Sequence, residues 1–133
     1  MRQRRDRVLV VDDASNMRDL LTVLLEVEDD FQVVGAVRDG AQAIERAAEL
    51  QPDVILLDIA MPGMDGMAAL PELRRIAPQA RIVVFSAFEE GELGERALNH
   101  GADVYIEKGT GVTELVSRLR ALRPPDATGK LEA

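Results

Sequence analysis

Five polar side chains of this sequence stand at or just beyond the ends of short apolar runs. Asp12 and Asp13 follow one run and Asp58 follows a second. Ser86 follows a third run, and Lys108 comes two residues after a fourth. Three carboxylates gathered in one place repel one another unless protons or a cation offset their charge. If the fold brings these residues together, the site therefore needs a positive partner.

Mg²⁺ fits that need, because it binds one or two carboxylates together with water and phosphate oxygens. With the metal bound, one carboxylate is able to attack phosphorus and form an aspartyl-phosphate. The ammonium group of Lys108 would offset charge on the transferring phosphoryl oxygens, and the hydroxyl of Ser86 would donate a hydrogen bond. The set predicts phosphoryl-transfer chemistry.

The apolar runs have the pattern of strands that are buried on both faces. Val8–Val11 and 54–57 are continuous, without polar alternation. Amphipathic segments with helical spacing separate the runs, which predicts an α/β domain with a parallel sheet and helices on both faces. The carboxyl ends of parallel strands lie along one edge, where open sheets bind ligands. The expected strands are 8–11, 31–37, 54–57, 81–85 and 104–106, and the expected helices are 17–27, 39–50, 67–76, 89–99 and 112–122.

Composition excludes several classes of protein and site. The 133 residues are 47% hydrophobic and 30% charged, which suits one globular domain. The absence of cysteine and the single histidine, His100, exclude thiolate metal sites, disulfide scaffolds and multi-histidine centres. The net charge of −8 argues against a nucleic-acid surface. No apolar run approaches the roughly 20 residues of a membrane span and no signal peptide is found, so we expect a cytoplasmic location. The arginines near the start are interpreted as a solvated end.

At these residues the sequence resembles the receiver domains of two-component response regulators. The likeness covers nearly the whole chain and rests on four segments in the expected order. They are 12–13 (DD), 56–66 (LLDIAMPGMDG), 86–87 (SA) and 105–108 (YIEK). The resemblance implies a flavodoxin-like, doubly wound, five-stranded parallel sheet with strand order 2-1-3-4-5. Residues 1–122 would form the receiver domain, and residues 123–133, which lack periodicity, a linker or a disordered tail.

The resemblance also implies roles for the acidic residues. Asp58 is the phosphoacceptor. Asp13 binds Mg²⁺ directly, Asp12 assists through water, and the backbone carbonyl of Ala60 is another ligand. The phosphoryl group comes from the phosphohistidine of a sensor histidine kinase or from a small phosphodonor.

The remaining roles concern the response to phosphorylation. Lys108 pairs with the phosphoryl group, Ser86 moves to bond it, and Tyr105 changes rotamer. The face formed by the helix 89–99, the last strand and the last helix then mediates dimerisation or docks a partner. The resemblance implies a signalling domain that assists only its own phosphorylation and slow dephosphorylation, with no contact to nucleic acid or membrane.

Several of these residues have structural alternatives. Asp13 or Ser15 is able to cap the first helix, and Ser86 the fourth. Tyr105 as a half-buried aromatic on an edge strand is as good an interpretation as a switch. Gly91 and Gly94 lie inside the expected helix 89–99, each at a cost of about 1 kcal/mol relative to Ala. We therefore expect that helix to be mobile.

Three positions depart from the family's usual pattern. Gly109 follows Lys108 where many members have proline, which leaves the backbone there freer. Ala60 and Phe88 stand where polar groups often orient the hydrolytic water. We hypothesise that neither activates water, which would give a long-lived phosphorylated form.

Two other function classes compete with the receiver interpretation. A Mg²⁺-dependent phosphatase of the haloacid dehalogenase type would carry two carboxylates spaced D-x-D after its first strand, whereas Asp12 and Asp13 are adjacent. A DNA-binding regulator would need a helix-turn-helix domain, for which too few residues follow Leu122. A stand-alone receiver and a receiver cut at a linker both remain open.

Overall fold

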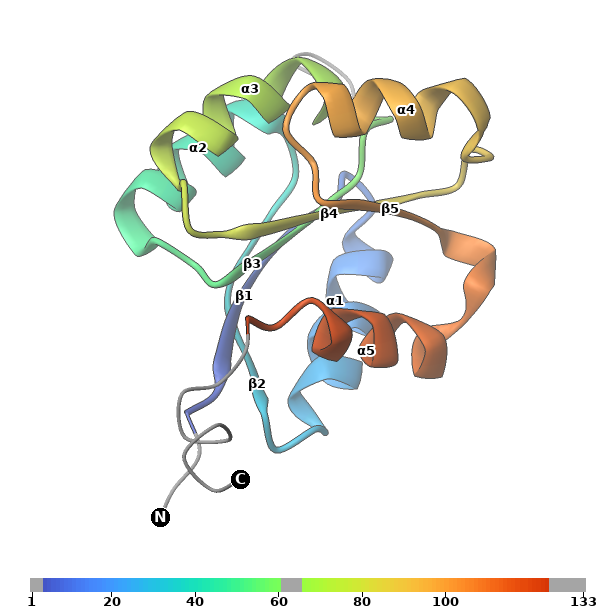
Figure 1. Cartoon of the computed structure of the whole chain (residues 1–133). Coiled ribbons are helices and arrows are strands. Elements are labelled where there is room, and N and C mark those ends of the chain that lie inside the picture. Colours follow the sequence, from blue (N-terminus) through green and yellow to red (C-terminus); the bar gives the residue numbers. More distant parts are fainter. Residues whose placement is uncertain (1–3, 61–65, 125–133) are drawn as a thin grey trace.

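The computed structural model describes residues 4–60 and 66–124, in which a five-stranded sheet is covered by helices on both faces (Figure 1). All neighbouring strands are parallel, and their order is β2-β1-β3-β4-β5. The predicted flavodoxin-like order is therefore confirmed. The strands are β1 (Asp6–Val11), β2 (Phe31–Val37), β3 (Val54–Leu57), β4 (Arg81–Ser86) and β5 (Val104–Glu107). The helices are α1 (Ser15–Glu26), α2 (Gly40–Leu50), α3 (Gly66–Ile76), α4 (Gly91–Asn99) and α5 (Val112–Ala121).

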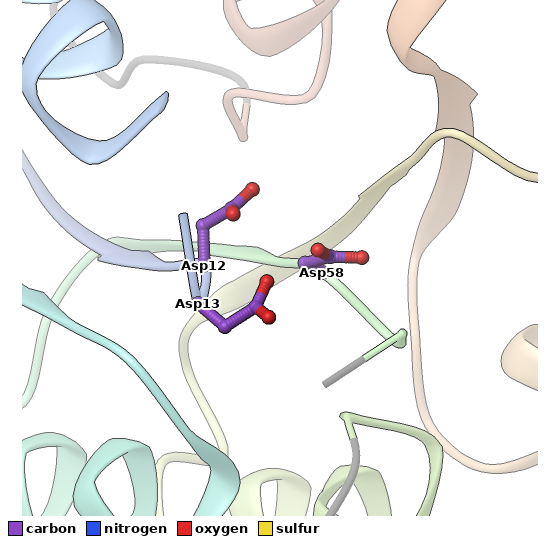
Figure 2. A group of neighbouring side chains, drawn as sticks. All are labelled: Asp12, Asp13 and Asp58. Carbon is purple, nitrogen blue, oxygen red and sulfur yellow. The ribbon is translucent and has the colours of Figure 1, made fainter. Parts of the chain in front are cut away.

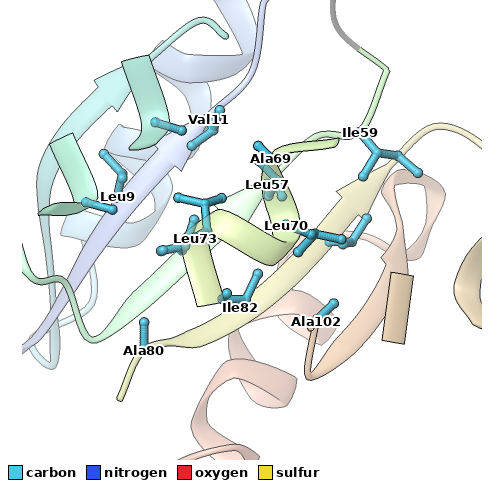
Figure 3. Packing of buried hydrophobic residues seen from close by; sticks show 14 of the residues in the cluster. Leu9, Val11, Leu57, Ile59, Ala69, Leu70, Leu73, Ala80, Ile82 and Ala102 are labelled. Carbon is cyan, nitrogen blue, oxygen red and sulfur yellow. The ribbon is translucent and has the colours of Figure 1, made fainter. Parts of the chain in front are cut away.

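Alternate residues of each strand supply two hydrophobic cores on opposite faces of the sheet. Leu9, Leu57 and Ile82 face α2, α3 and α4, where they pack with Leu70 and Leu73 of α3 (Figure 3). Their neighbours along the strands pack on the other face against α1 and α5. Every residue of β3 is buried, as the continuous apolar run predicted.

Two predictions about helix starts were wrong. Neither Asp13 nor Ser15 caps α1, whose N-cap residue is Ala14 and carries no side-chain cap. Gly91 is the first residue of α4, with φ 28°, so only Gly94 of the two glycines lies inside the helix. The predicted cap was wrong because local residue type does not reveal where the backbone turns. No helix in the described ranges is long and apolar enough to span a bilayer.

The arginines near the start of the chain were interpreted as a solvated end. The structure shows that Arg4 and Arg7 also bind other parts of the chain. Arg7 donates through Nη1 to the carbonyls of Leu50 and Gln51 at the end of α2, at 2.9 and 3.0 Å. Arg4 forms an ion pair with Asp53 at 2.9 Å, although its side chain is 74% exposed. Cationic groups near helix carbonyl ends are favourable because they complement the helix dipole. Arg7 therefore helps to attach β1 to the end of α2.

A cluster of ion pairs joins the end of α5 to the loop before β2. Asp30 accepts hydrogen bonds from Arg120 Nε at 2.7 Å and from Arg123 Nη2 at 2.8 Å. Both guanidinium groups lie over the ring of Phe31, at 5.6 and 5.0 Å from its centroid. Arg123 also pairs with Asp6 at 2.6 Å, so folded contacts reach past the expected boundary at residue 122.

Asp30→Asn is expected to lower the free energy of unfolding by about 1 kcal/mol at neutral pH, since its carboxylate is partly exposed and charged hydrogen bonds are screened there. The hydrogen bond from Arg120, with that from Arg123, holds the pKa of Asp30 well below its ordinary value. A depressed folded pKa stabilises the fold above the unfolded pKa of about 3.9, and this contribution declines as the pH falls below it.

Urea unfolding at pH 7 and at stepwise lower pH measures this effect. The difference between wild type and Asp30→Asn should shrink below about pH 4. Asp29→Asn, an exposed neighbour, serves as the control and should match the wild type throughout. An equal difference at every pH would show that the pairs do not carry the stabilisation.

Candidate functional site

The ends of β1 and β3 bring the three predicted carboxylates together. These strands are neighbours, with Val11 paired to Leu57, and Asp12 and Asp58 follow the paired residues. Carboxylate oxygens of Asp12, Asp13 and Asp58 lie within 4.8 Å of one another (Figure 2). The expected meeting of acidic side chains at the carboxyl edge of the sheet is therefore observed.

The three carboxylates differ in their exposure to solvent. Asp12 is 1% exposed and Asp58 5% exposed, whereas Asp13 lies on the surface. Burial raises the pKa of Asp58 above its ordinary value, and the negative charge of Asp12 adds to that effect. A hydrogen bond from the Ala60 amide and the charge of Lys108 oppose the rise without cancelling it. The site thus concentrates negative charge that water solvates poorly.

Lys108 is the cation that faces this charge. Its Nζ lies 2.7 Å from Oδ2 of Asp12 and 3.4 Å from Oδ2 of Asp58. Burial alone would lower the pKa of Lys108, but the hydrogen bond to Asp12 and the charges of both carboxylates together raise it. Lys108 therefore carries its charge at neutral pH. One ammonium against three carboxylates leaves the cluster in need of further positive charge.

Backbone amides fix the orientation of the two buried carboxylates. Oδ1 of Asp12 accepts from the Ala14 amide at 2.9 Å, and Oδ1 of Asp58 accepts from the Ala60 amide at 3.0 Å. The side chain of Arg18 donates to the Asp12 carbonyl at 2.8 Å, which holds the loop after β1. Sequence reasoning missed Arg18, whose only signal was its position one turn into α1.

Ser86 and Tyr105 both form hydrogen bonds with the backbone of Phe88. Ser86 is the last residue of β4, fully buried, and its Oγ accepts from the Phe88 amide at 3.2 Å. It does not cap α4, so that alternative was wrong. Tyr105 is 1% exposed, not half-buried, and its hydroxyl donates to the Phe88 carbonyl at 2.8 Å. Both side chains thus hold the loop that leads to α4.

Glu107 makes a further contact, with the start of α4, that the sequence did not reveal. Its Oε2 accepts a hydrogen bond from the Glu90 amide at 2.9 Å, at the start of α4. The available signal was alternation along β5, which places Tyr105 and Glu107 on the same face of that strand. The middle of the motif 56–66, residues 61–65, lies outside the described residues.

Comparison with known proteins identifies the same domain. Residues 8–120 match the family described as the response regulator receiver domain. A protein-glutamate methylesterase/protein-glutamine glutaminase 5 of Myxococcus xanthus is 41% identical over 143 residues, covering 96% of this chain and 41% of that protein. The chain spans about half the length, or less, of such curated relatives.

Two solved structures show the likeness in three dimensions. The response regulator domain of Thermotoga maritima CheB has a TM-score of 0.83 and 37% identity, covering 91% of this chain and all of that one. The CheX-CheY-BeF3-Mg²⁺ complex of Borrelia burgdorferi has a TM-score of 0.82 and 27% identity, covering 88% of each chain. The strand order, the acidic cluster and the family match agree. This chain belongs to the response regulator receiver domains, which act as phosphoacceptors in two-component signalling.

Proposed function

We propose that Asp58 takes a phosphoryl group from the phosphohistidine of a sensor histidine kinase or from a small phosphodonor, with Mg²⁺ as cofactor. The observation that carries this proposal is the meeting of three carboxylates within 4.8 Å beside Lys108. In the reaction a carboxylate oxygen of Asp58 forms a bond to phosphorus. The bond from phosphorus to the donor nitrogen or oxygen breaks, and the leaving group keeps its electron pair.

Of the two buried carboxylates, Asp58 is the better nucleophile because its oxygens are less committed to short hydrogen bonds. Both oxygens of Asp12 accept short hydrogen bonds, from Ala14 at 2.9 Å and from Lys108 at 2.7 Å. Among the described residues, Oδ2 of Asp58 has only the longer contact with Lys108, at 3.4 Å. Weak solvation and few hydrogen bonds leave its lone pairs available for attack on phosphorus. Asp13 is exposed and therefore better suited to binding a solvated cation.

The donor set fits Mg²⁺. Hard oxygen ligands from Asp12, Asp13, Asp58 and the Ala60 carbonyl would hold it, with water completing the coordination. When bound, the metal supplies the positive charge that offsets the phosphoryl oxygens. Lys108 adds a second positive group, placed by its bonds to Asp12 and Asp58. The adjacent acidic pair after β1, in place of D-x-D, supports a receiver over a phosphatase.

The response would pass through Ser86 and Tyr105. In the unphosphorylated chain, Ser86 Oγ accepts a hydrogen bond from the Phe88 amide. When the hydroxyl turns toward the phosphoryl group, that amide loses its acceptor. Tyr105 then changes rotamer, because the Phe88 carbonyl that it bonds moves with the loop. The face of α4, β5 and α5 would carry the change to a partner or to a second copy of the chain. Such a local event needs an element with two arrangements, and this face is the candidate.

Phosphoryl uptake with acetyl phosphate tests the proposal. Intact-mass spectrometry should show the gain of one phosphoryl group in Mg²⁺ and none after chelation of the metal. Asp13→Asn is expected to raise the Mg²⁺ concentration for half-maximal rate about ten-fold, because it replaces a charged oxygen ligand by a neutral one. Asp19→Asn, an exposed carboxylate on α1, is the matched control and should leave that concentration unchanged. Phosphoryl uptake that is the same with Mg²⁺ and after chelation would refute the metal site.

A further inference from the structure

The loop between β4 and α4, residues 87–90, is held from two strands. From β4, Ser86 Oγ accepts from the Phe88 amide at 3.2 Å. From β5, the Tyr105 hydroxyl donates to the Phe88 carbonyl at 2.8 Å, and Glu107 accepts from the Glu90 amide at 2.9 Å. Glu107 is the charged member of this group, and its contact spans 17 residues of sequence.

Glu107 acts as a cap for α4, whose own N-terminal residues supply no side-chain cap. The N-cap residue of α4, Glu90, has no side-chain cap of its own. The first amides of a helix have no partner within the helix, and a carboxylate there also complements the helix dipole. The oxygen of Glu107 meets one such amide from the neighbouring strand. The start of α4 is therefore tied to β5 through this bond.

The same residue adjoins two residues of the proposed site, one along the strand and one across the ladder. Glu107 is the ladder partner of Ser86 and directly precedes Lys108, whose ammonium contacts Asp58. Phosphorylation of Asp58 adds up to two negative charges near these residues. Once Ser86 turns to the phosphoryl group, the Phe88 amide loses its acceptor. The Glu107 carboxylate, which binds the Glu90 amide, is then repelled by the new charge on Asp58.

We propose that Glu107 is a positioning residue that latches the start of α4 in the unphosphorylated chain and releases it when Asp58 is phosphorylated. This inference rests on the proposed function of Asp58. Two properties of the side chain are separable: its oxygen accepts the Glu90 amide, and its charge is repelled by the phosphoryl group. Glu107→Gln keeps the acceptor and loses the charge, whereas Glu107→Ala loses both.

Hydrogen exchange of the Glu90 amide, followed by NMR, tests the latch at rest. Glu107→Ala should exchange about five-fold faster than wild type, the effect of losing one exposed hydrogen bond. Glu107→Gln should restore the wild-type rate, which a general loss of structure would not allow. Addition of Mg²⁺ and beryllofluoride, a phosphoryl mimic, should speed this exchange in the wild type. The same addition should speed the exchange of the Glu90 amide much less in Glu107→Gln.

Glu92→Gln removes the same charge from the first turn of α4 and should behave as the wild type in both states. Wild-type exchange at Glu90 that stays constant, while the Asp58 and Ala60 amides respond to the mimic, would overturn the latch and leave the phosphoacceptor assignment standing. Glu107→Ala exchange equal to wild type at rest would do the same. Asp58 and Ala60 amides that do not respond would overturn the proposed function, and the latch with it.

Discussion

Replacement of Asp58 by Asn is expected to abolish phosphoryl uptake while leaving the chain folded. The amide has nearly the shape of the carboxylate and still accepts from the Ala60 amide, so the loop after β3 keeps its anchor. The amide oxygen carries no charge and is a poor nucleophile toward phosphorus. The loss should be complete within the sensitivity of intact-mass spectrometry, with acetyl phosphate and Mg²⁺ present.

The stability of Asp58→Asn separates loss of chemistry from loss of fold. Burial and the charge of Asp12 both raise the pKa of Asp58, so the ionised form is disfavoured where it stands. Neutralising that position should keep or raise the midpoint of thermal unfolding. A variant that still gains a phosphoryl group at the wild-type rate would place the acceptor elsewhere. Peptide mapping of the phosphorylated wild type would then locate it.

The elements that hold the site could be read from the sequence because burial leaves a plain pattern. The bounds of β2 and β3 agree with the predicted ranges, and β3, which is buried throughout, ends where the polar Asp58 begins. Parallel strands then require that Asp12, Asp13 and Asp58 share an edge. The acidic cluster followed from these two facts, whereas the strand order was implied by the resemblance to receiver domains.

Contacts that join distant parts of the chain left no such pattern. The bond between Glu107 and the Glu90 amide depends on how the loop after β4 turns, which no local residue type records. The pairing of Arg120 with Asp30 joins residues 90 positions apart, and each alone resembles an ordinary surface charge. Capping of α1 by Asp13 or Ser15 failed as a prediction for the same reason, because the turn of the backbone makes Ala14 the N-cap residue.

Gly66 shows how a turn signal in the sequence conceals a stronger constraint. It ends the motif 56–66 in the sequence, and it is the first residue of α3. A Cβ added at Gly66 would lie 2.3 Å from the carbonyl oxygen of Asp58 and 2.7 Å from Cα of Ile59. Both are backbone atoms, so no side chain is able to move aside. Glycine is needed here to let α3 approach the phosphoacceptor strand.

Gly66→Ala is therefore expected to destabilise the fold by about 1–3 kcal/mol, the usual cost of overpacking. The gain of about 1 kcal/mol that alanine brings applies to a helix interior, whereas Gly66 is the first residue of α3. Because the displaced atoms belong to Asp58 and its neighbour, phosphoryl uptake should slow as well. Urea unfolding and intact-mass kinetics measure the two effects on the same protein.

Gly109→Ala is the matched control, since an added Cβ there meets nothing within 4 Å. Its free energy of unfolding should stay within about 0.5 kcal/mol of wild type. A Gly66→Ala variant as stable and as fast as Gly109→Ala would mean that the loop relaxes without moving Asp58. The position of the nucleophile would then not depend on the close approach of α3. If both stability and rate fall only at Gly66, the packing of one backbone against another sets where phosphorus is attacked.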